Sequence, residues 1–519
     1  MIVEDQQALI EFLSQPGAYG LGPDVPVARV DTHSAVVFLA GAQAYKLKRA
    51  VRYDYLDFST AERRRRFCDA EVALNRRTAP AIYDRCVPIT REAGGRHALD
   101  GQGPPVDWVV RMRRFPDEDL LDRVAARGAL DLALMPRLAD AIARLHRTAE
   151  PRPDKGGAAG MAWVVAGNER GLEHEGGAIF EPALRTRVVE ATRRELARTA
   201  ARLDDRRRDG AVRVCHGDLH LGNIVLLDGE PTLFDAIEFN DDISCIDVLY
   251  DVAFLLTDLW RLGLRQHANA LFNRYVSGTF GRAGDYEALT LLPLFLSCRS
   301  TVRAKTSATA SRLQPDETHA APLAAAARVY LAEADELLHP PAPRLIAVGG
   351  LSGSGKSTVA RQLAAAVGGA PGALVLRTDV IRKQLCGVGE ETRLGPDAYA
   401  DEMNVRVYTE LLARAAAALR AGHAVIADGV FARVWERAAL ERVARDARVD
   451  WNAAWLDAST DLRAERIRGR QGDASDATVE ILAAQAVEVE PPDTWARIEA
   501  AGETATVVAR VAERLGLVR

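Results

Sequence analysis

The feature that most constrains the fold is the run GLSGSGKST, from Gly350 to Thr358, which lies between the apolar segment LIAVGG and the segment STVARQLAAAV. It satisfies the pattern G-x-x-x-x-G-K-[ST], with an expected strand before it and an expected helix after it, as the pattern requires. Glycines in such a loop allow backbone N–H groups to face phosphates. The run therefore predicts a nucleotide-binding loop, and the alternative of a Gly/Ser-rich linker conflicts with this context.

Two side chains of the loop have expected roles of their own. Lys356 is predicted to reach the terminal phosphates and to take part in catalysis, and the Ser357 hydroxyl is predicted to bind magnesium. The other loop residues predicted to contact the nucleotide are Gly350, Gly353, Ser354, Gly355 and Thr358.

Around this loop, apolar strands alternate with Ala-rich helices. The segments RLIAVG, ALVLRT, AVIAD and NAAWLD read as strands, and this alternation predicts an α/β domain with a parallel sheet covered on both faces. The segment HPPAP, 339–343, interrupts helix formation and is the predicted linker. The P-loop domain is therefore expected over residues 344–519.

Polar residues at the ends of the predicted strands are candidates for catalysis. Asp379 follows the strand ALVLRT and is placed to accept a proton from a substrate hydroxyl, with Arg382 orienting the substrate; a helix cap is the alternative for Asp379. Asp428 closes the strand AVIAD and is placed to hold magnesium through water; the alternative is a simple turn residue. Further along, Arg463, Arg466 and Arg470 either close over the transferring phosphate or form a solvated helix face.

The quoted residues resemble a known group of enzymes. Residues 344–519 are similar to the small P-loop kinases of the nucleotide, gluconate, polynucleotide 5′-hydroxyl and zeta-toxin type, in GLSGSGKST, LRTDVIRKQL and VIADGVF. The spacing of Asp379 and Arg382 resembles the polynucleotide kinase and zeta-toxin arrangement. The resemblance implies a base and a substrate-positioning arginine, and it does not identify the substrate.

A second motif, VCHGDLHLGNIVLLDGEPTLFDAIEF, spans Val214 to Phe239. Asp218 precedes Asn223 with the spacing of a kinase catalytic loop, and Asp235 follows. This pattern predicts that Asp218 accepts or orients the proton of a substrate hydroxyl, and that Asn223 and Asp235 hold magnesium. Two strands, IVLL and TLFD, joined by the turn Asp228-Gly229, are expected to bring Asn223 and Asp235 to one end.

This motif resembles the aminoglycoside phosphotransferase and choline kinase family. His216-Gly217-Asp218, Asn223, Asp235 and Glu238 match the family's H-G-D-x-x-x-x-N and I-D-x-x-E patterns. The resemblance implies an α+β bilobal protein-kinase-like domain over residues 1–338, with a small lobe over about 1–112 and a large lobe over about 113–338. His216 and His220 are expected to shape the loop, because two histidines without a third ligand rarely bind zinc.

A small lobe of this kind needs a lysine for the phosphates and a helix glutamate to hold that lysine. The strands AVVFLA and AYKLK lie in the small lobe, and Lys46 and Lys48 point to the same face of the second strand. Lys46 is preferred, Lys48 remains an alternative, and Glu71 is the expected partner. The family resemblance also implies that Met112 lies at the adenine-contacting hinge.

Two features of the small lobe stand apart from this assignment. No G-x-G-x-x-G precedes AYKLK; the corresponding turn is DTHS, with Gly41 nearby, so the cover of the nucleotide phosphates is not identified. The four arginines of the helix TAERRRRFCDAEVALNRR are expected to form a solvated face, with a substrate clamp as the lesser alternative.

The totals limit the classes of protein. The chain has 519 residues, a net charge of -5 and a mean hydropathy of -0.10, which favour two domains, one of them bilobal, and a small partner over nonspecific nucleic-acid binding. The cysteines lack metal-ligand spacing, and the acidic N-terminus with no long apolar run predicts a cytoplasmic, non-membrane protein. The six cysteines are Cys68, Cys86, Cys215, Cys245, Cys298 and Cys386.

The whole chain resembles the bacterial two-domain proteins that pair an aminoglycoside-phosphotransferase-like domain with a P-loop kinase-like ATPase domain. This resemblance implies a phosphotransferase that uses ATP or another nucleoside triphosphate with magnesium, has two nucleotide sites, and acts on a hydroxyl of a sugar, an aminoglycoside or a related metabolite. In the alternative, only the P-loop half is catalytic, on a polynucleotide 5′-hydroxyl or a nucleotide sugar, and the first domain binds substrate or regulates. A regulatory ATP-binding switch is the third hypothesis.

Overall fold

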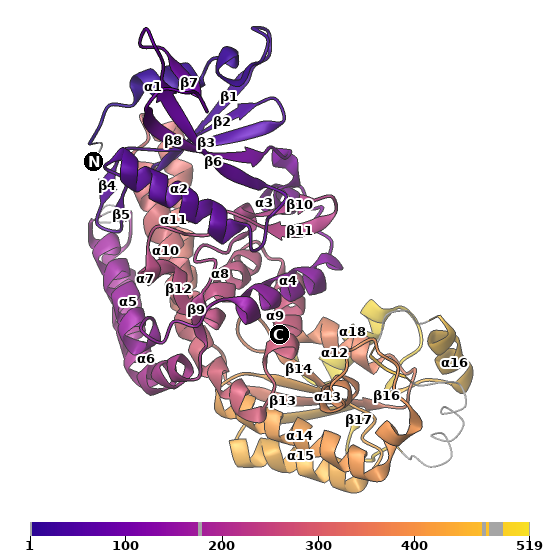
Figure 1. Ribbon diagram of the computed structural model, residues 1–519. Helices are drawn as coiled ribbons and strands as arrows, with labels where there is room; N and C mark the ends of the chain where they lie inside the picture. Colours follow the sequence, from indigo (N-terminus) through magenta and orange to yellow (C-terminus); the bar gives the residue numbers. More distant parts are fainter. Residues whose placement is uncertain (1–2, 175–178, 470–473, 477–490, 518–519) are drawn as a thin grey trace. The chain divides into compact units, whose positions relative to one another are not determined.

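The structure is a computed structural model that describes residues 3–174, 179–469, 474–476 and 491–517. Its contacts divide the chain into two compact units, Met1–Gly160 with Asp204–Leu255, and Met161–Leu203 with Leu256–Arg519 (Figure 1). The second unit thus groups the helices that follow residue 256 with the P-loop part. The limits 1–338 and 344–519, inferred from sequence, stay a prediction.

The first unit begins with an antiparallel six-stranded sheet in the order β1-β2-β3-β8-β6-β7. Helices α1 and α2 pack against opposite faces of this sheet. The elements are α1 (Gln7–Leu13), η1 (Pro16–Tyr19), β1 (Val27–Asp31), β2 (Ala35–Ala40), β3 (Gln43–Lys48), β4 (Arg52–Tyr53), β5 (Leu56–Asp57), α2 (Ala61–Asn75), β6 (Tyr83–Arg91), β7 (His97–Leu99) and β8 (Pro105–Arg113).

Side-chain alternation along β3 decides which residues face α2. Tyr45 and Leu47 lie in the core cluster that contains α1, so Lys46 and Lys48 lie on the opposite face. Both ammonium groups contact Glu71 of α2. The prediction that the two lysines share one face is confirmed.

The prediction of a fully solvated arginine face on α2 is wrong for one residue. Arg64 is fully buried, and its guanidinium donates to Asp107 Oδ1 at 2.8 Å, to the Phe58 carbonyl at 3.0 Å and to Glu4 Oε2 at 2.9 Å. Asp107 lies on β8, which packs against α2. Arg64 therefore ties the helix to the sheet, which a pattern of four consecutive arginines does not reveal.

The rest of the first unit carries the catalytic-loop motif. The antiparallel hairpin β10–β11 pairs IVLL with EPTL, so the second strand ends two residues earlier than the predicted TLFD. Ile224 pairs with Leu233 and the Phe234 N–H donates to the Asn223 carbonyl at 3.0 Å, so Asp235, the next residue, follows directly at the end of the hairpin where Asn223 lies. The elements are η2 (Asp117–Asp119), α3 (Leu121–Ala126), α4 (Leu134–Thr148), β9 (Val212–Val214), η3 (Leu221–Asn223), β10 (Ile224–Leu227), β11 (Glu230–Leu233), α7 (Asp241–Ser244), β12 (Cys245–Asp247) and α8 (Val248–Arg261), whose last turns belong to the second unit.

Long helices form the first part of the second unit. Two of them, α5 and α6, begin or end in the first unit. The elements are α5 (Gly157–His174) and α6 (Pro182–Arg208), each shared with the first unit, then α9 (Arg265–Thr279), η4 (Ala283–Leu291), α10 (Leu292–Arg312) and α11 (Glu317–Leu338).

The second part of this unit is the predicted α/β domain. Its described strands form a parallel sheet in the order β14-β15-β13-β16-β17, with α12 and α18 against one face and α14 and α15 against the other (Figure 1). The elements are β13 (Arg344–Gly350), α12 (Lys356–Ala364), β14 (Leu374–Arg377), α13 (Thr378–Leu385), η5 (Pro396–Tyr399), α14 (Asp401–Arg420), β15 (Val425–Asp428), α15 (Val434–Ala447), β16 (Asp450–Asp457), α16 (Thr460–Arg468), β17 (Ala496–Glu499) and α18 (Thr504–Arg514).

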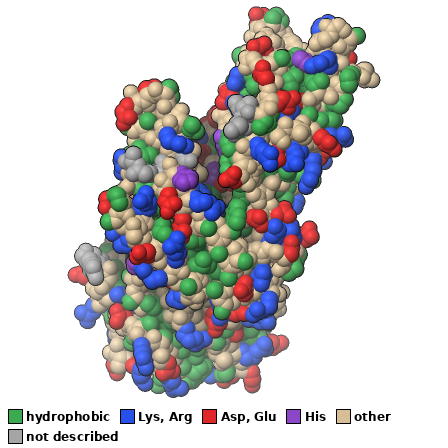
Figure 2. All heavy atoms as spheres, turned by 90° about the vertical axis from the view of Figure 1, so that its left-hand side faces the viewer, with side chains coloured by type: hydrophobic (Ala, Val, Ile, Leu, Met, Phe, Trp, Pro, Cys, Tyr) green, Lys and Arg blue, Asp and Glu red, His purple; other side chains and the backbone are tan. Residues whose placement is uncertain are grey.

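The visible surface carries charges of both signs, in keeping with the low net charge of the chain. Figure 2 shows Lys and Arg side chains interspersed with Asp and Glu side chains over the visible face, so neither sign dominates there. Among the helices that the structure describes, none is both long enough and apolar enough to cross a membrane.

A half-buried carboxyl in the helical part, that of Glu333, makes stability depend on pH. Burial raises the pKa of Glu333 on α11 to about 7, although the Ser300 hydroxyl donates to it at 2.9 Å and Arg261 lies near. The folded state therefore holds this proton more tightly than the unfolded state, so Glu333 contributes less stability as the pH rises from about 4.5 to 7.

Glu333→Gln is therefore expected to gain stability relative to the wild type as the pH rises from about 5 to 8, because glutamine resembles the protonated carboxyl. Melting temperatures of both proteins across this range test the expectation. A constant difference between the two melting temperatures would show that this carboxyl titrates normally.

Candidate active sites

The loop that follows β9 holds the predicted base in a fixed arrangement. Asn223 Nδ2 donates to the carbonyl of Asp218 at 2.9 Å and to its Oδ2 at 3.1 Å. His220 Nδ1 accepts from the Gly222 N–H at 3.1 Å, and its Nε2 lies 3.3 Å from Asp218 Oδ2. Asp218 and Asn223 are thus brought together, and His220 shapes the loop as expected.

The aspartate Asp251 of α8 anchors this loop and was missed by the sequence prediction. Its fully buried carboxylate accepts from the N–H groups of His216 at 3.1 Å and Gly217 at 2.9 Å, and it lies 3.0 Å from His146 Nε2. The ligand atoms of His146, Cys215 and Asp251 lie within 4.8 Å of one another, but both Asp251 oxygens already accept hydrogen bonds. This cluster is therefore explained by loop support rather than by metal binding.

Asp235 sits in a strained turn that other residues support. Its φ of 61° lies in the left-handed region, which is uncommon for residues other than glycine. Its N–H donates to the Tyr83 hydroxyl at 3.1 Å, and the next N–H, of Ala236, donates to Asn75 Oδ1 at 2.8 Å. Such supported strain is typical of functional sites, and here it leaves the Asp235 side chain 41% exposed.

Five charged side chains connect this turn to the small lobe. Lys46 Nζ lies 2.8 Å from Glu71 Oε1 and 2.6 Å from Asp235 Oδ1. Lys48 Nζ lies 2.5 Å from Glu71 Oε2 and also contacts Glu238. The side chain of Lys46 is 17% exposed and that of Lys48 only 2%. Lys46 is therefore the lysine that a ligand can reach beside Asp235, whereas Lys48 is enclosed by two carboxylates.

The pKa directions favour the charged forms of the lysines and of Glu71, whereas burial raises the pKa of Glu238. Burial alone raises the pKa of Glu71, but the ammonium groups of Lys46 and Lys48 outweigh it and hold that pKa at about 2. Burial lowers the pKa of Lys48, and Glu238 and Glu71 more than reverse this effect. Both lysines and Glu71 are thus charged at neutral pH.

The two lysines predict different results on substitution. Lys48→Met leaves Glu71 and Glu238 buried beside each other, and breaking a buried ion pair in this way costs about 3–5 kcal/mol. Lys46→Met is expected to cost less in stability, because Lys46 is more exposed, and to weaken nucleotide binding instead. Urea denaturation and nucleotide titration of both variants test this contrast, and equal losses of stability would contradict the assignment.

The end of β3 is secured behind the lysines. Gln6 Nε2 donates to the Lys48 carbonyl at 3.1 Å and to Asp107 Oδ2 at 2.8 Å, and Gln6 Oε1 accepts from the Ala50 N–H at 2.7 Å.

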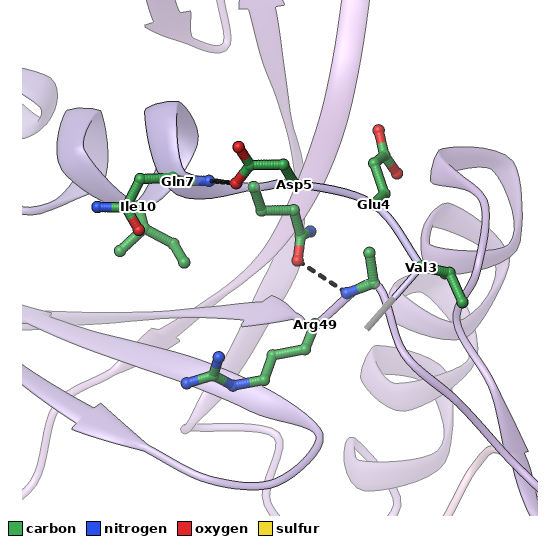
Figure 3. Close-up of a pocket in the computed structure, with 8 residues that line it drawn as sticks. Val3, Glu4, Asp5, Gln7, Ile10 and Arg49 are labelled. Carbon is green, nitrogen blue, oxygen red and sulfur yellow. Dashed lines mark hydrogen bonds between the residues drawn. The ribbon is translucent and has the colours of Figure 1, made fainter. Parts of the chain in front are cut away.

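A hollow beside this junction is lined in part by Asp5 and Arg49 (Figure 3). The predicted site residues do not line this hollow, so it is separate from the site.

The turn between β1 and β2 carries the residues Thr32, His33 and Ser34. Ala35 N–H donates to Thr32 Oγ1 at 2.9 Å, and Arg49 holds the turn through its Nε, which donates to the Thr32 carbonyl at 2.9 Å. Burial lowers the pKa of His33 in this turn, and the charge of Asp218 opposes that shift.

Met112, the predicted hinge residue, is buried in β8, opposite Ala44 of β3.

The P-loop has the backbone that its glycines predict. Gly353 and Gly355 have φ values of 80° and 92°, and α12 starts at Lys356, directly after Gly355. A Cβ on Gly353 would lie 2.7 Å from the Arg463 carbonyl oxygen, so the position has no room for a side chain. Ser357 and Thr358 follow Lys356 in the first turn of α12.

Asp379 and Asp428 lie at neighbouring strand ends beside this loop. Asp428 ends β15, opposite Val348 of β13 and Arg377 of β14, and Arg377 Nε lies 3.3 Å from its Oδ2. Asp379 lies in the first turn of α13, where Arg377 is the N-cap residue, so the helix-cap alternative for Asp379 is wrong. The pKa of Asp379 is raised above its usual value, because the effect of burial exceeds the opposing charges of Lys356 and Arg377.

The three predicted arginines and Arg382 differ in their surroundings. Arg382 Nη1 donates to the Ala398 carbonyl at 2.7 Å, and its guanidinium lies 4.7 Å from the Tyr399 ring. Arg466 donates to the carbonyls of Ser354 at 3.0 Å and Ala500 at 2.8 Å, so it braces the P-loop. Arg463 is 3% exposed rather than part of a solvated face, and Arg470 lies outside the described residues.

Comparison with known proteins identifies both parts of the chain. Residues 40–291 match the phosphotransferase enzyme family, and residues 345–492 match a family described as an AAA domain. Uncharacterized proteins of Mycobacterium tuberculosis (Rv2004c) and Mycobacterium bovis (Mb2027c) are 34% identical over 481 residues, which cover 91% of this chain and 92% of each relative.

Solved structures with related folds include kinases. A gluconokinase from Sinorhizobium meliloti is 23% identical, with a TM-score of 0.25, over 34% of this chain and 92% of that chain. A choline/ethanolamine kinase family protein from Mesorhizobium loti is 13% identical, with a TM-score of 0.35, over 63% of this chain and 99% of that chain.

The two family matches define the class of protein. An α+β protein-kinase-like region is followed by an α/β P-loop kinase-like domain with a parallel sheet, and the chain is a kinase. The extended identity shows that it belongs to the same family as the two mycobacterial proteins.

Proposed function

We propose that this kinase is an ATP- and magnesium-dependent phosphotransferase with two nucleotide sites, one in each family region. Each site would transfer the γ-phosphoryl group to a hydroxyl of a small molecule such as a sugar, an aminoglycoside or a related metabolite. The observation that carries the proposal is the presence of a lysine and acidic groups in both regions: Lys46 with Glu71 and Asp235, and Lys356 beside Asp379.

In the first site, Lys46 would bind the nucleotide phosphates while Glu71 keeps the ammonium group in place. Asp218 would accept or orient the proton of the acceptor hydroxyl, and its bond with Asn223 Nδ2 at 3.1 Å supports a fixed position for the carboxylate. Because phosphoryl transfer has little covalent chemistry for the protein to perform, positioning and charge would supply most of the rate enhancement.

In the second site, backbone N–H groups of the P-loop and Lys356 would bind the phosphates. Asp379 would receive the acceptor proton, and its raised pKa is in the direction that suits a base, because a more basic carboxylate accepts a proton more readily. Arg382 would orient the acceptor. The P-loop contact of Arg466 supports a bracing role rather than a mobile lid.

Both sites have oxygen donors that fit magnesium, a hard cation that prefers carboxylate and hydroxyl oxygen. Asp428 is buried, and its Oδ1 has no hydrogen-bond partner among the described residues, which suits a carboxylate that holds a hydrated ion. Ser357, directly after the P-loop lysine, would be the other magnesium ligand of this site. In the first site Asn223 and Asp235 would hold magnesium, which when bound would neutralise phosphate charge.

The experiment is transfer of labelled γ-phosphate from magnesium-ATP to a panel of sugars, aminoglycosides, nucleosides and 5′-hydroxyl oligonucleotides. Labelling of a small-molecule hydroxyl supports the proposal. Labelling restricted to oligonucleotide 5′-ends would instead favour the hypothesis in which only the P-loop half is catalytic. Nucleotide binding without transfer to any acceptor would favour a regulatory switch.

A further inference from the structure

Helix α9 covers the edge strand of the P-loop sheet. Among the strands that the structure describes, β14 is the last on its side of the sheet, so no described strand pairs with its outer backbone groups. Asn273 of α9 accepts from the Val375 N–H at 2.7 Å and donates to the Ala373 carbonyl at 3.2 Å. Asn269 donates to the carbonyls of Pro371 and Ala373, both at 3.0 Å. Two side-chain amides thus replace the missing strand.

The same helix also holds α13 and the loop that follows it. Gln384 of α13 donates to the Ser277 carbonyl at 2.8 Å. The Ser277 hydroxyl donates to Glu390 Oε1 at 2.8 Å, and Arg274 Nη1 lies 2.8 Å from Glu390 Oε2. Because these three contacts end on Arg274 and Ser277, about one helical turn apart, α9 fixes the loop and the end of α13 together.

These contacts bracket the residues of the second site. Strand β14 ends at Arg377, and α13 carries Asp379 and Arg382 in its first two turns. The bonds from Asn273 lie before this segment and the bond to Gln384 lies after it. A shift of α9 would therefore move the segment relative to the P-loop, which follows β13, the strand on the far side of β15 from β14.

The burial of Asn269 indicates that the contact between α9 and the turn before β14 is a stable part of the fold. Asn269 is only 3% exposed, and its amide meets carbonyl groups of the chain turn that leads into β14. Buried amides of this kind hold one geometry, because losing their partners leaves them unsatisfied. Helix α9 lies inside the range that matches the phosphotransferase enzyme family, whereas β14 and α13 lie in the range that matches the AAA domain.

We propose that α9 is a positioning element of the P-loop kinase site, with Asn273 and Ser277 as positioning residues that hold Asp379 and Arg382 against the P-loop. A helix of one family region thus completes the acceptor side of the other region's site. The proposal rests on the proposed function in one respect, that the P-loop half transfers phosphate.

The first test is hydrogen–deuterium exchange of the full chain. In Asn273→Ala, peptides that cover 374–385 are expected to exchange about fivefold faster, the effect of losing about one net hydrogen bond, while β13 and β15 stay protected. Thr279→Ala is the control, because that hydroxyl donates within its own helix, to the Tyr275 carbonyl. Unchanged exchange over 374–385, or an equal increase throughout the sheet, would overturn the positioning role.

The second test measures catalysis by the P-loop site, in an Asp218→Asn background that removes the other site. Asn273→Ala is expected to lower kcat about tenfold, and Ser277→Ala about threefold, while magnesium-ATP affinity changes less than about twofold. Faster exchange over 374–385 with an unchanged kcat would overturn the proposal. Lys356→Ala distinguishes failure of the proposed function from failure of the positioning role of α9. If this substitution leaves phosphate transfer intact, the proposed function of the P-loop half fails, while the exchange result still decides the role of α9.

Discussion

Replacing Asp218 by asparagine is expected to lower phosphoryl transfer by the first site about 10²–10⁴-fold, the usual contribution of a general base in proton transfer. Asparagine keeps the shape of the side chain and can still accept from Asn223 Nδ2, so the loop should retain its structure. The reaction is best followed in a Lys356→Ala background, where transfer of labelled phosphate reports the first site alone.

Asp228→Asn is a matched control for this substitution. Asp228 lies at the tip of the β10–β11 hairpin, and its side chain is 77% exposed. This variant should transfer phosphate at the wild-type rate. If Asp218→Asn also kept the wild-type rate in the background that isolates the first site, Asp218 would not be the base and the first site would lose its assigned chemistry.

Replacing Lys356 by alanine is expected to lower transfer by the P-loop site about 10²–10³-fold, because a charge aimed at the transferring phosphate contributes on this scale. Lys356 is the first residue of α12, directly after Gly355, and its charge also acts on Asp379. Loss of the ammonium group therefore affects the phosphate site and the candidate base together. The measurement is the same transfer assay, in an Asp218→Asn background.

Gln362→Ala on the exposed face of the same helix serves as the control for Lys356→Ala, and should leave both nucleotide affinity and rate unchanged. A Lys356→Ala protein that still binds magnesium-ATP and transfers phosphate at the normal rate would remove the P-loop from the reaction.

The local loop geometry could be predicted where the residues are close in sequence. GLSGSGKST and HGDLHLGN each form one continuous loop whose local backbone brings the functional groups together, so spacing alone was sufficient. The fold class followed for the same reason, since strand and helix alternate over the whole P-loop region. The roles of the individual residues stay predictions.

Residues that act over long sequence distances were missed. Asp251 supports the N–H groups of His216 and Gly217 from a mostly apolar helix, and the signal was an acidic residue in the middle of VLYDVAFLL. The choice between Lys46 and Lys48 also needed the structure, because both lie on one face of β3 and differ only in what encloses them.

The edge contact of α9 is the clearest case of information absent from the sequence pattern. Asn273 and Val375 are separated by 102 residues, and an asparagine on a helix is ordinarily solvated. The same holds for Arg64, whose partner Asp107 lies 43 residues away. Polar residues that replace missing strand contacts or tie a helix to a sheet carry no periodicity, so only tertiary structure identifies them.

The central claim, two nucleotide sites in one chain, is tested most directly by calorimetric titration of the full chain with magnesium and a nonhydrolysable ATP analogue. The expected result is two equivalents bound per chain for the wild type, and one equivalent for each of Lys46→Met and Lys356→Ala. A wild-type stoichiometry of one, abolished by one of these substitutions and unchanged by the other, would contradict the presence of two nucleotide sites.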